Sequence, residues 1–409
     1  MSIETARPAG DLRHPRRTGS PLPHPIVSLG AAVGAVIGLW PSGLPRDAMI
    51  SAAVTAVCTA IATVLGLVVA RRRSARPPTR VASAAVAAGI VVCAGVLSLA
   101  WQNALRGDLG APAVGAEWFA VSVVPASILF AAVVYLPRVT ALITATVTAT
   151  LAGYLPAAQA DGAQPAPRAP ATVIYSGVED APLAQRSHAL ASRWVSAGGL
   201  DRRAVVIAVP TGSGWVDAGA VSGFVDRFDG DVAVLALQYG DQPSWRAFVG
   251  DRSAAGRSAT AVLREVIDRT RARPTGARPE IIVYGQSLGA IGAEDARVWA
   301  AIHRPGAVTE TLLTGVPGGS VDAGPGPGSV RVIRANASDP VPRWSISVLW
   351  RPVQQPAGTL ITGRPVRRPP WLPVAGFVQT SADLLVSLDG PAGVGHRYGP
   401  EQSSPPARS

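Results

Sequence analysis

Two features of this 409-residue sequence predict an N-terminal α-helical transmembrane bundle followed by a C-terminal α/β domain with a doubly wound, mostly parallel sheet. Apolar segments of about membrane-spanning length occupy residues 25–156. After residue 170, short apolar strands alternate with helical stretches, which is typical of a parallel sheet covered by helices. We expect a basic tail (1–24), a transmembrane domain (25–156), a Pro/Ala linker (157–170) and the α/β domain (171–409).

The net charge of +11 is carried by arginine alone, since the chain contains no lysine. The arginines cluster beside apolar segments instead of forming a stripe with interleaved aromatics, so they indicate membrane topology and argue against a nucleic-acid partner. Cys58 and Cys93 both lie inside apolar segments, where a thiol behaves as a small hydrophobe. The sequence therefore predicts no disulfide, no metal site and no cofactor, and it leaves the oligomeric state open.

Four apolar segments follow the basic tail, which lacks the apolar core and cleavage site of a signal peptide. A bilayer is spanned by about 20 apolar residues, and we expect spans at 25–40, 48–70, 81–101 and 116–136. Five arginines lie between the second and third spans and favour the cytoplasmic side for that loop: Arg71, Arg72, Arg73, Arg76 and Arg80. The chain is thus expected to be a multi-pass protein of the cell membrane with a cytoplasmic N-terminus.

Two features of the membrane domain allow more than one interpretation. Gly30, Gly34 and Gly38 form a small-residue face that suits dimerisation or, as we favour, packing against another helix of the same chain. Segment 139–155 is short and rich in threonine, so it fits a fifth transmembrane helix, which we favour, or a strand. Five spans place the α/β domain outside the cytoplasm, whereas four keep it inside.

The α/β domain is predicted from short apolar runs that alternate with helical periodicity. Strands are expected at 172–176, 204–209, 232–237, 280–285, 309–314 and 330–335. Helices are expected near 183–196, 215–228, 260–271, 288–303 and 377–388. We find no clear strand between Asp339 and His396.

The fourth of these strands runs into Gly285-Gln286-Ser287-Leu288-Gly289 and then into a helix rich in alanine. A serine on a strained corner between a strand and a helix exposes its hydroxyl only if the residues two before and two after it are small. Gly285 and Gly289 meet this requirement. The pattern predicts a nucleophile elbow with Ser287 as the nucleophile.

A serine nucleophile needs a base, and the usual chain order is serine, then acid, then histidine. Of the five histidines, four precede the elbow or end its helix: His14, His24, His188 and His303. By elimination and order, His396 is the candidate base.

For the acid we favour Asp339, which lies just past the strand at 330–335, where ligand-facing groups gather in such sheets. Its role would be to orient the imidazole and to stabilise its protonated form. An Asp-Pro pair is also a common turn starter. Asp383 is the competing acid, on the polar face of the predicted helix 377–388.

An oxyanion is stabilised by two aimed N–H groups, one of them normally on the residue after the nucleophile, here Leu288. The second is expected from the glycine-rich loop 209–215, where Thr211 or Gly212 is the candidate. The loop resembles a phosphate cradle, but it lacks the Lys-Ser/Thr pair of a P-loop.

Four motifs behind several membrane spans carry a resemblance to a known family: Gly-Gln-Ser-Leu-Gly, Ala-Ser-Asp-Pro-Val, Pro-Thr-Gly-Ser-Gly-Trp-Val-Asp and Gly-His-Arg-Tyr-Gly. Together they resemble the actinobacterial membrane-anchored α/β-hydrolase family with an N-terminal multi-span domain. In that family the elbow more often reads Gly-Glu-Ser-Leu-Gly, so Gln286 is a departure. The resemblance implies a serine hydrolase fold and five spans, but no particular substrate.

The main functional hypothesis is a membrane-bound serine hydrolase that forms an acyl-enzyme on an ester or thioester, in particular a lipid or cell-envelope ester. An acyltransferase with the same triad is the first alternative, and a non-catalytic membrane protein with a hydrolase-like binding domain is the second. A channel or transporter ranks last, because we find no ionisable residue well inside the predicted spans.

Overall fold

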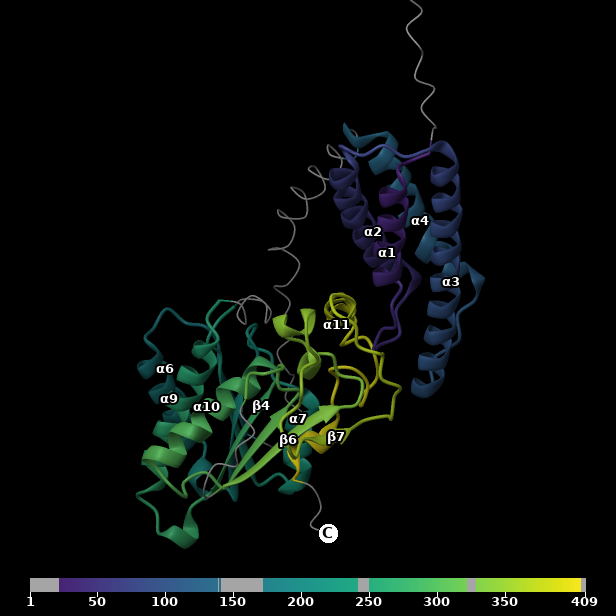
Figure 1. Ribbon diagram of the computed structural model, residues 1–409. Helices are drawn as coiled ribbons and strands as arrows, with labels where there is room; N and C mark the ends of the chain where they lie inside the picture. The colour runs from purple at the N-terminus through teal and green to yellow at the C-terminus, as the bar shows by residue number, and fades with distance from the viewer. Residues whose placement is uncertain (1–21, 139, 141–171, 242–249, 322–328, 406–409) are drawn as a thin grey trace, which may run out of the picture.

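The computed structural model describes residues 22–138, 140, 172–241, 250–321 and 329–405 (Figure 1). Within these residues, the N-terminal part forms a bundle of four helices: α1 (Pro25–Gly38), α2 (Ala48–Ala70), α3 (Pro77–Leu109) and α4 (Ala116–Tyr135). Three of them, α2, α3 and α4, are long and apolar enough to cross a membrane, and α1 is a shorter apolar helix. The predicted linker and, apart from Thr140, the predicted fifth segment lie outside the described residues.

Helix α3 is longer than the predicted span 81–101 at both ends. Pro77 begins it, because the fixed φ of proline suits the first turn of a helix. The helix continues through polar residues until Gly110, whose left-handed conformation (φ 69°) ends it. This extension carries α3 past the apolar region and toward the α/β domain (Figure 1).

The glycine face of α1 packs against α2, which confirms the interpretation that we favoured. A Cβ atom on Gly34 would lie 2.4 Å from the carbonyl oxygen of Cys58, and one on Gly38 would lie 2.5 Å from the Cα of Thr55. Gly30 approaches the carbonyl of Ala62 in the same way, with a Cβ distance of 3.2 Å. Small residues therefore let the two helix backbones approach closely.

The described C-terminal residues form a seven-stranded sheet in which every neighbouring pair is parallel, in the order β1-β3-β2-β4-β5-β6-β7. The strands are β1 (Thr172–Ser176), β2 (Ala204–Val209), β3 (Val232–Leu237), β4 (Glu280–Gln286), β5 (Glu310–Thr314), β6 (Val330–Asn336) and β7 (Leu360–Thr362). Each parallel connection needs a crossover, which puts helices on the faces of the sheet. The predicted fold class is confirmed.

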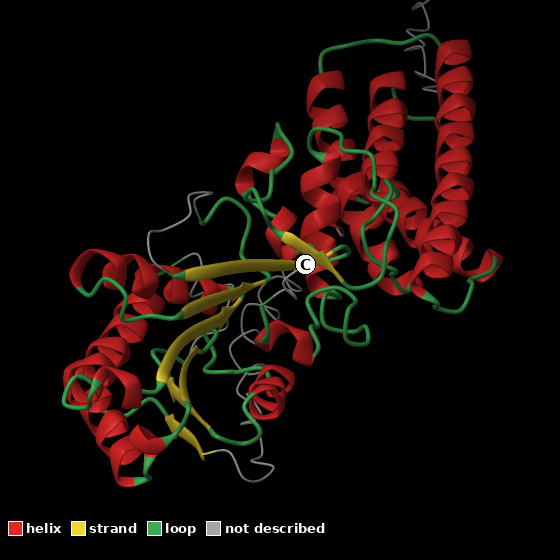
Figure 2. Ribbon diagram, turned by 90° about the horizontal axis from the view of Figure 1, so that it is seen from below, coloured by secondary structure: helices red, strands yellow, loops and turns green. Residues whose placement is uncertain are grey.

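Helices cover both faces of the sheet (Figure 2). On one face lie α6 (Leu183–Ser196), α9 (Ser253–Thr270) and α10 (Leu288–His303), and on the other lies α7 (Ala218–Arg227). Strand β4 contributes side chains to the hydrophobic clusters on both faces of the sheet. Ile281 and Val283 belong to one cluster, and Ile282 and Tyr284 belong to the other. The sheet core thus holds the end of β4, and with it the elbow, in a fixed place.

In the α/β domain, the main differences from prediction concern α9, α7 and β7. Helix α9 begins seven residues earlier than expected, because Ala255 and Ala259 extend its buried face. Helix α7 begins later, at Ala218, where Asp217 accepts a hydrogen bond from the Ala220 N–H. The short strand β7 was not predicted, because only three residues pair with β6 and none is fully buried. Helix α11 (Ala375–Leu385) corresponds to the predicted helix 377–388 and lies next to the ends of α1 and α2 (Figure 1).

Candidate active site

Ser287 occupies a strained corner between β4 and α10. Its φ of 56° and ψ of −125° are sparsely populated for a residue other than glycine. The Ser287 N–H donates to the carbonyl of Thr314 at the end of β5 (3.0 Å). Ser287 is partly exposed, whereas every other residue from 281 to 294 is buried. In this stretch, the fold therefore exposes only Ser287 to solvent, as a nucleophile elbow requires.

The two elbow glycines allow this corner to form. A Cβ atom on Gly285 would lie 2.2 Å from the carbonyl oxygen of Gly289, and one on Gly289 would lie 2.2 Å from that of Val209. Any larger residue at either place would collide with main-chain atoms. The close approach also brings the start of α10 against the end of β2, from which the loop 209–215 leaves the sheet.

Asp339 and His396 lie together although 57 residues separate them in the chain. The Nδ1 of His396 is 2.8 Å from Oδ2 of Asp339, and Asp339 is fully buried. The other carboxylate oxygen of Asp339 accepts a hydrogen bond from the N–H of Val341 (2.8 Å). With Nδ1 bonded to the acid, the tautomer that carries its proton on Nδ1 leaves Nε2 as the proton acceptor.

The Nε2 of His396 is buried and has no hydrogen-bond partner among the residues that the structure describes. Buried polar atoms are nearly always paired, so an unpaired ring nitrogen marks a place where chemistry or a ligand is expected. The ring lies beside the elbow. A Cβ atom on Gly315, the residue after Thr314, would lie 2.4 Å from its Cε1.

The loop that carries His396 is held by polar side chains at the ends of β4 and β6. Asn336 donates to the carbonyls of Gly395 (3.0 Å) and Arg397 (2.9 Å), and the Ser338 hydroxyl accepts from the Gly395 N–H (2.8 Å). Gln286, next to the nucleophile, donates to the carbonyl of His396 (3.0 Å). These contacts fix the position of the histidine at the ends of β4 and β6.

Comparison with protein-family models matches residues 173–322 and 327–405 to the Alpha/beta-hydrolase family, and residues 39–194 to the Alpha/beta-hydrolase family N-terminus. The chain belongs to this α/β-hydrolase family. The resemblance found in the sequence is therefore confirmed. No curated protein and no solved structure matched in the corresponding searches.

Tyr398 is a residue of the candidate site that the sequence did not single out. Its hydroxyl donates to Oδ2 of Asp339, the oxygen that also faces His396. The Asn336 N–H in turn donates to the Tyr398 oxygen (3.1 Å). Burial, reinforced by the neighbouring Asp339 charge, raises the pKa of Tyr398 well above its usual value near 10, so the phenol stays a donor. The signal available in the sequence was its place two residues after His396.

The two groups of oxyanion candidates meet at the junction of β2 and α10 in the hydrolase domain. Leu288 is the first residue of α10, so its N–H has no helical carbonyl to bind. The Thr211 N–H already donates to the carbonyl of Trp215 (2.9 Å). Of the two loop residues, Gly212 is therefore the better candidate, and both assignments stay predictions.

The competing acid, Asp383, does not lie on a polar, solvated face of the hydrolase domain as we expected. It is buried, and its Oδ1 binds Arg46 of the α1–α2 loop at 2.7 Å. Its Oδ2 accepts the Gly43 N–H (2.7 Å). An acid paired in this way is not available to His396, and Asp383 instead joins the hydrolase domain to the N-terminal helix bundle.

Proposed function

We propose that this α/β-hydrolase is a membrane-bound serine hydrolase in which Ser287, His396 and Asp339 form a catalytic triad. The Ser287 hydroxyl would attack an ester or thioester carbonyl while Nε2 of His396 takes its proton. His396 would then protonate the leaving group, and an acyl-enzyme would remain until water releases the acyl group. Asp339 would hold the imidazole and stabilise its charged form.

One observation carries this proposal: the His396 ring is bonded to a buried acid through Nδ1, while its Nε2 is buried, unpaired among the described residues and close to the elbow. A histidine with a merely structural role would be expected to use both ring nitrogens. The strained and partly exposed Ser287 supplies the group that is expected to face this nitrogen.

The substrate that we favour is a lipid or cell-envelope ester, because the domain is joined to apolar helices that suggest a membrane-associated protein. The domain contacts the bundle through the α1–α2 loop and the end of α3. The arginine-rich segment 71–80, which includes the first turn of α3, lies at the opposite ends of α2 and α3. Because arginine favours the cytoplasmic side, this arrangement supports an extracytoplasmic hydrolase domain.

The direct test is labelling of the full chain in detergent or nanodiscs with a fluorophosphonate, whose phosphorus is attacked by an activated serine with loss of fluoride. Wild type should label, whereas Ser287→Ala and His396→Ala should not, and Asp339→Asn should label far more slowly. Ser222→Ala and His188→Ala are matched controls, because both residues are exposed and outside the site. Failure of folded wild type to label would favour a non-catalytic binding domain.

The side of the membrane is tested separately. A reporter fused after Ser409 should be accessible from outside intact cells. Accessibility only from the cytoplasm would contradict the extracytoplasmic placement without affecting the triad.

A further inference from the structure

The hydrolase domain exposes a group of large apolar side chains on the segment between β6 and α11. Its members, here called the apolar face, are Ile346, Trp350, Trp371, Leu372 and Val374, which are 59%, 60%, 37%, 41% and 46% exposed. They come from two stretches held together by the Trp371 indole N–H, which donates to the Val348 carbonyl (3.2 Å), and by the Val374 N–H, which donates to that of Leu349 (3.0 Å). Large exposed apolar patches mark interaction sites.

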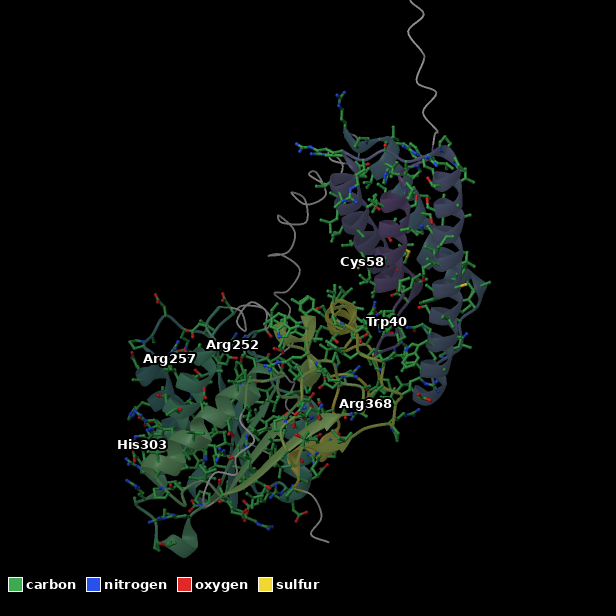
Figure 3. All side chains as sticks on the ribbon, viewed as in Figure 1. Trp40, Cys58, Arg252, Arg257, His303 and Arg368 are labelled. Atoms are coloured by element: carbon green, nitrogen blue, oxygen red, sulfur yellow. The ribbon has the colours of Figure 1, made fainter. Side chains whose placement is uncertain are left out.

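The apolar face is joined directly to the end of the membrane bundle. The Trp40 indole, just after α1, donates to the carbonyl of Pro370 (2.8 Å), which precedes Trp371. Gln379 of α11 donates to the carbonyls of Ile37 and Gly38 at the end of α1 (2.7 and 3.0 Å). Figure 3 shows Trp40 between the bundle and the hydrolase domain. The apolar face therefore starts where the first apolar helix ends.

This end of the bundle has the composition of a membrane–water interface. Trp101 and Trp118 both donate through their indole N–H to the α1–α2 loop, at the carbonyls of Ser42 (2.9 Å) and Arg46 (3.1 Å). Trp40 and Trp101, which are partly exposed, form a tryptophan cluster with the buried Trp118 at this end of the bundle. Tryptophan is enriched at the level of the lipid headgroups, where one side of the ring is apolar and the other is wet.

We propose that the apolar face rests in the headgroup region of the leaflet on this side of the bundle, so that the hydrolase domain touches lipid as well as the transmembrane helices. The occupant is lipid because the patch continues from a tryptophan cluster at the bundle's end, and because exposed Arg351 follows Trp350 as a partner for lipid phosphates. Trp350 and Trp371 would then anchor the domain at a fixed height.

The lipid contact would also determine the route by which a substrate reaches Ser287, and this part of the inference rests on the proposed function. The segment that carries the apolar face follows Asp339 directly in the chain. It also reaches the loop after β5, since a Cβ atom on Gly318 would lie 2.7 Å from the carbonyl of Trp344 and 2.9 Å from the Cγ1 of Val353. A lipid substrate would thus reach Ser287 from the leaflet beside this segment.

The test starts from the variant Cys58→Ala, Cys93→Ala, into which Trp350→Cys or Leu372→Cys introduces a single cysteine that carries an environment-sensitive fluorophore. The labelled chain is placed in nanodiscs. Their phospholipids carry a spin label, which quenches the fluorophore, either near the headgroup or near the end of the acyl chain. Both positions should show blue-shifted emission and strong quenching by the headgroup-proximal label only. Ile302→Cys is the matched control, because Ile302 is 70% exposed at the end of α10, beside His303, on the side of the domain away from the bundle (Figure 3).

Quenching at both patch positions no greater than at residue 302 would overturn the proposal. A blue shift without quenching would overturn it too, since it indicates a protein surface over the patch. Fluorophosphonate labelling of the same samples reports on Ser287 independently. Lipid contact without labelling would therefore contradict the proposed function alone.

Discussion

The side-chain amide of Gln286 donates a 3.0 Å hydrogen bond to the main-chain carbonyl of His396. The residue before the predicted nucleophile thus holds the loop of the predicted base. Gln286→Leu would leave that buried carbonyl unpaired, which costs about 1–3 kcal/mol. If the loop moves in response, labelling by fluorophosphonate should slow by roughly tenfold, since 1.4 kcal/mol corresponds to a factor of ten in rate.

Gln402→Leu is the control for this prediction. Gln402 is also fully buried, but it binds Tyr284 and Asp217 instead of His396. Its variant should lower the melting temperature while the folded protein still labels at the normal rate. Equal labelling rates for wild type and Gln286→Leu would show that the Gln286 bond does not position the base.

Gly315 makes room for the imidazole of His396. Its φ of 57° is unfavourable for other residues, and an added Cβ would lie 2.4 Å from Cε1 and 2.9 Å from Nδ1 of His396. Gly315→Ala should therefore push the ring away from Asp339 and reduce labelling by about tenfold or more, the factor that corresponds to 1.4 kcal/mol. The measurement is the labelling rate of the folded variant.

Gly306→Ala separates this effect from backbone strain. Gly306 has a φ of 77°, yet an added Cβ would meet no atom within 4 Å. Both variants should lose about 1 kcal/mol of stability from the left-handed conformation, but only Gly315→Ala should label slowly. Similar labelling by the two variants would mean that the His396 ring tolerates the added methyl group.

The sequence predicted most of the sheet because its central strands are buried on both faces and read as continuous apolar runs. The same reasoning missed β7, whose three residues are half-buried or exposed at the sheet edge. The elbow was predictable because a strained corner needs glycines at fixed positions beside Ser287. Asp339 and His396 followed from chain order, which reflects how the strand ends of this fold converge.

Long-range pairing could not be predicted in this way. Asp383 lies on a helix whose polar face, by periodicity, should be solvated. Its partner Arg46 is 337 residues away in another part of the molecule, so no local pattern reports the contact. Tyr398 is a similar case, since its bond to Asp339 depends on how the last loop folds back over β6.

Tyr398 predicts a particular loss of stability at alkaline pH. Burial, with Asp339 as the next cause, raises its pKa well above 10 in the folded protein, whereas an unfolded tyrosine titrates near 10. Above about pH 10 the unfolded chain therefore binds fewer protons than the folded one, and the free energy of unfolding falls by about 1.4 kcal/mol per pH unit for each such group. Tyr398→Phe should make the melting temperature fall less steeply above pH 10.

Tyr284→Phe is the matched comparison. Burial also raises the pKa of Tyr284 well above 10, but its hydroxyl donates to Gln402 at 2.6 Å and not to Asp339. Both phenylalanine variants should flatten the alkaline loss of stability, and only Tyr398→Phe should also slow labelling at neutral pH. An unchanged alkaline slope in Tyr398→Phe would mean that this phenol ionises in the folded state as it does in water.

The Arg46–Asp383 pair predicts that the two parts of the molecule stabilise each other. Arg46 is buried, binds Asp383 through both Nε and a terminal nitrogen (3.1 and 2.7 Å) and also binds the Gln379 side chain (2.7 Å). Removing one member of a buried pair leaves an uncompensated charge and costs about 3–5 kcal/mol. Arg46→Ala and Asp383→Leu should each lower the melting temperature of the detergent-solubilised chain sharply.

The double variant Arg46→Met, Asp383→Leu should recover part of this loss, because it removes both buried charges together. Arg257→Ala provides the control, since the Arg257–Asp251 pair lies at the surface with both side chains 57% exposed, and this variant should leave the melting temperature unchanged.

Arg343 links the Arg46–Asp383 contact to the candidate site, because it donates to the carbonyls of Asp339 (3.0 Å) and Ser338 (2.9 Å) while lying against Gly43. The folded fraction of Arg46→Ala should therefore also label more slowly than wild type, and normal stability and labelling together would show that the bundle does not support the acid loop.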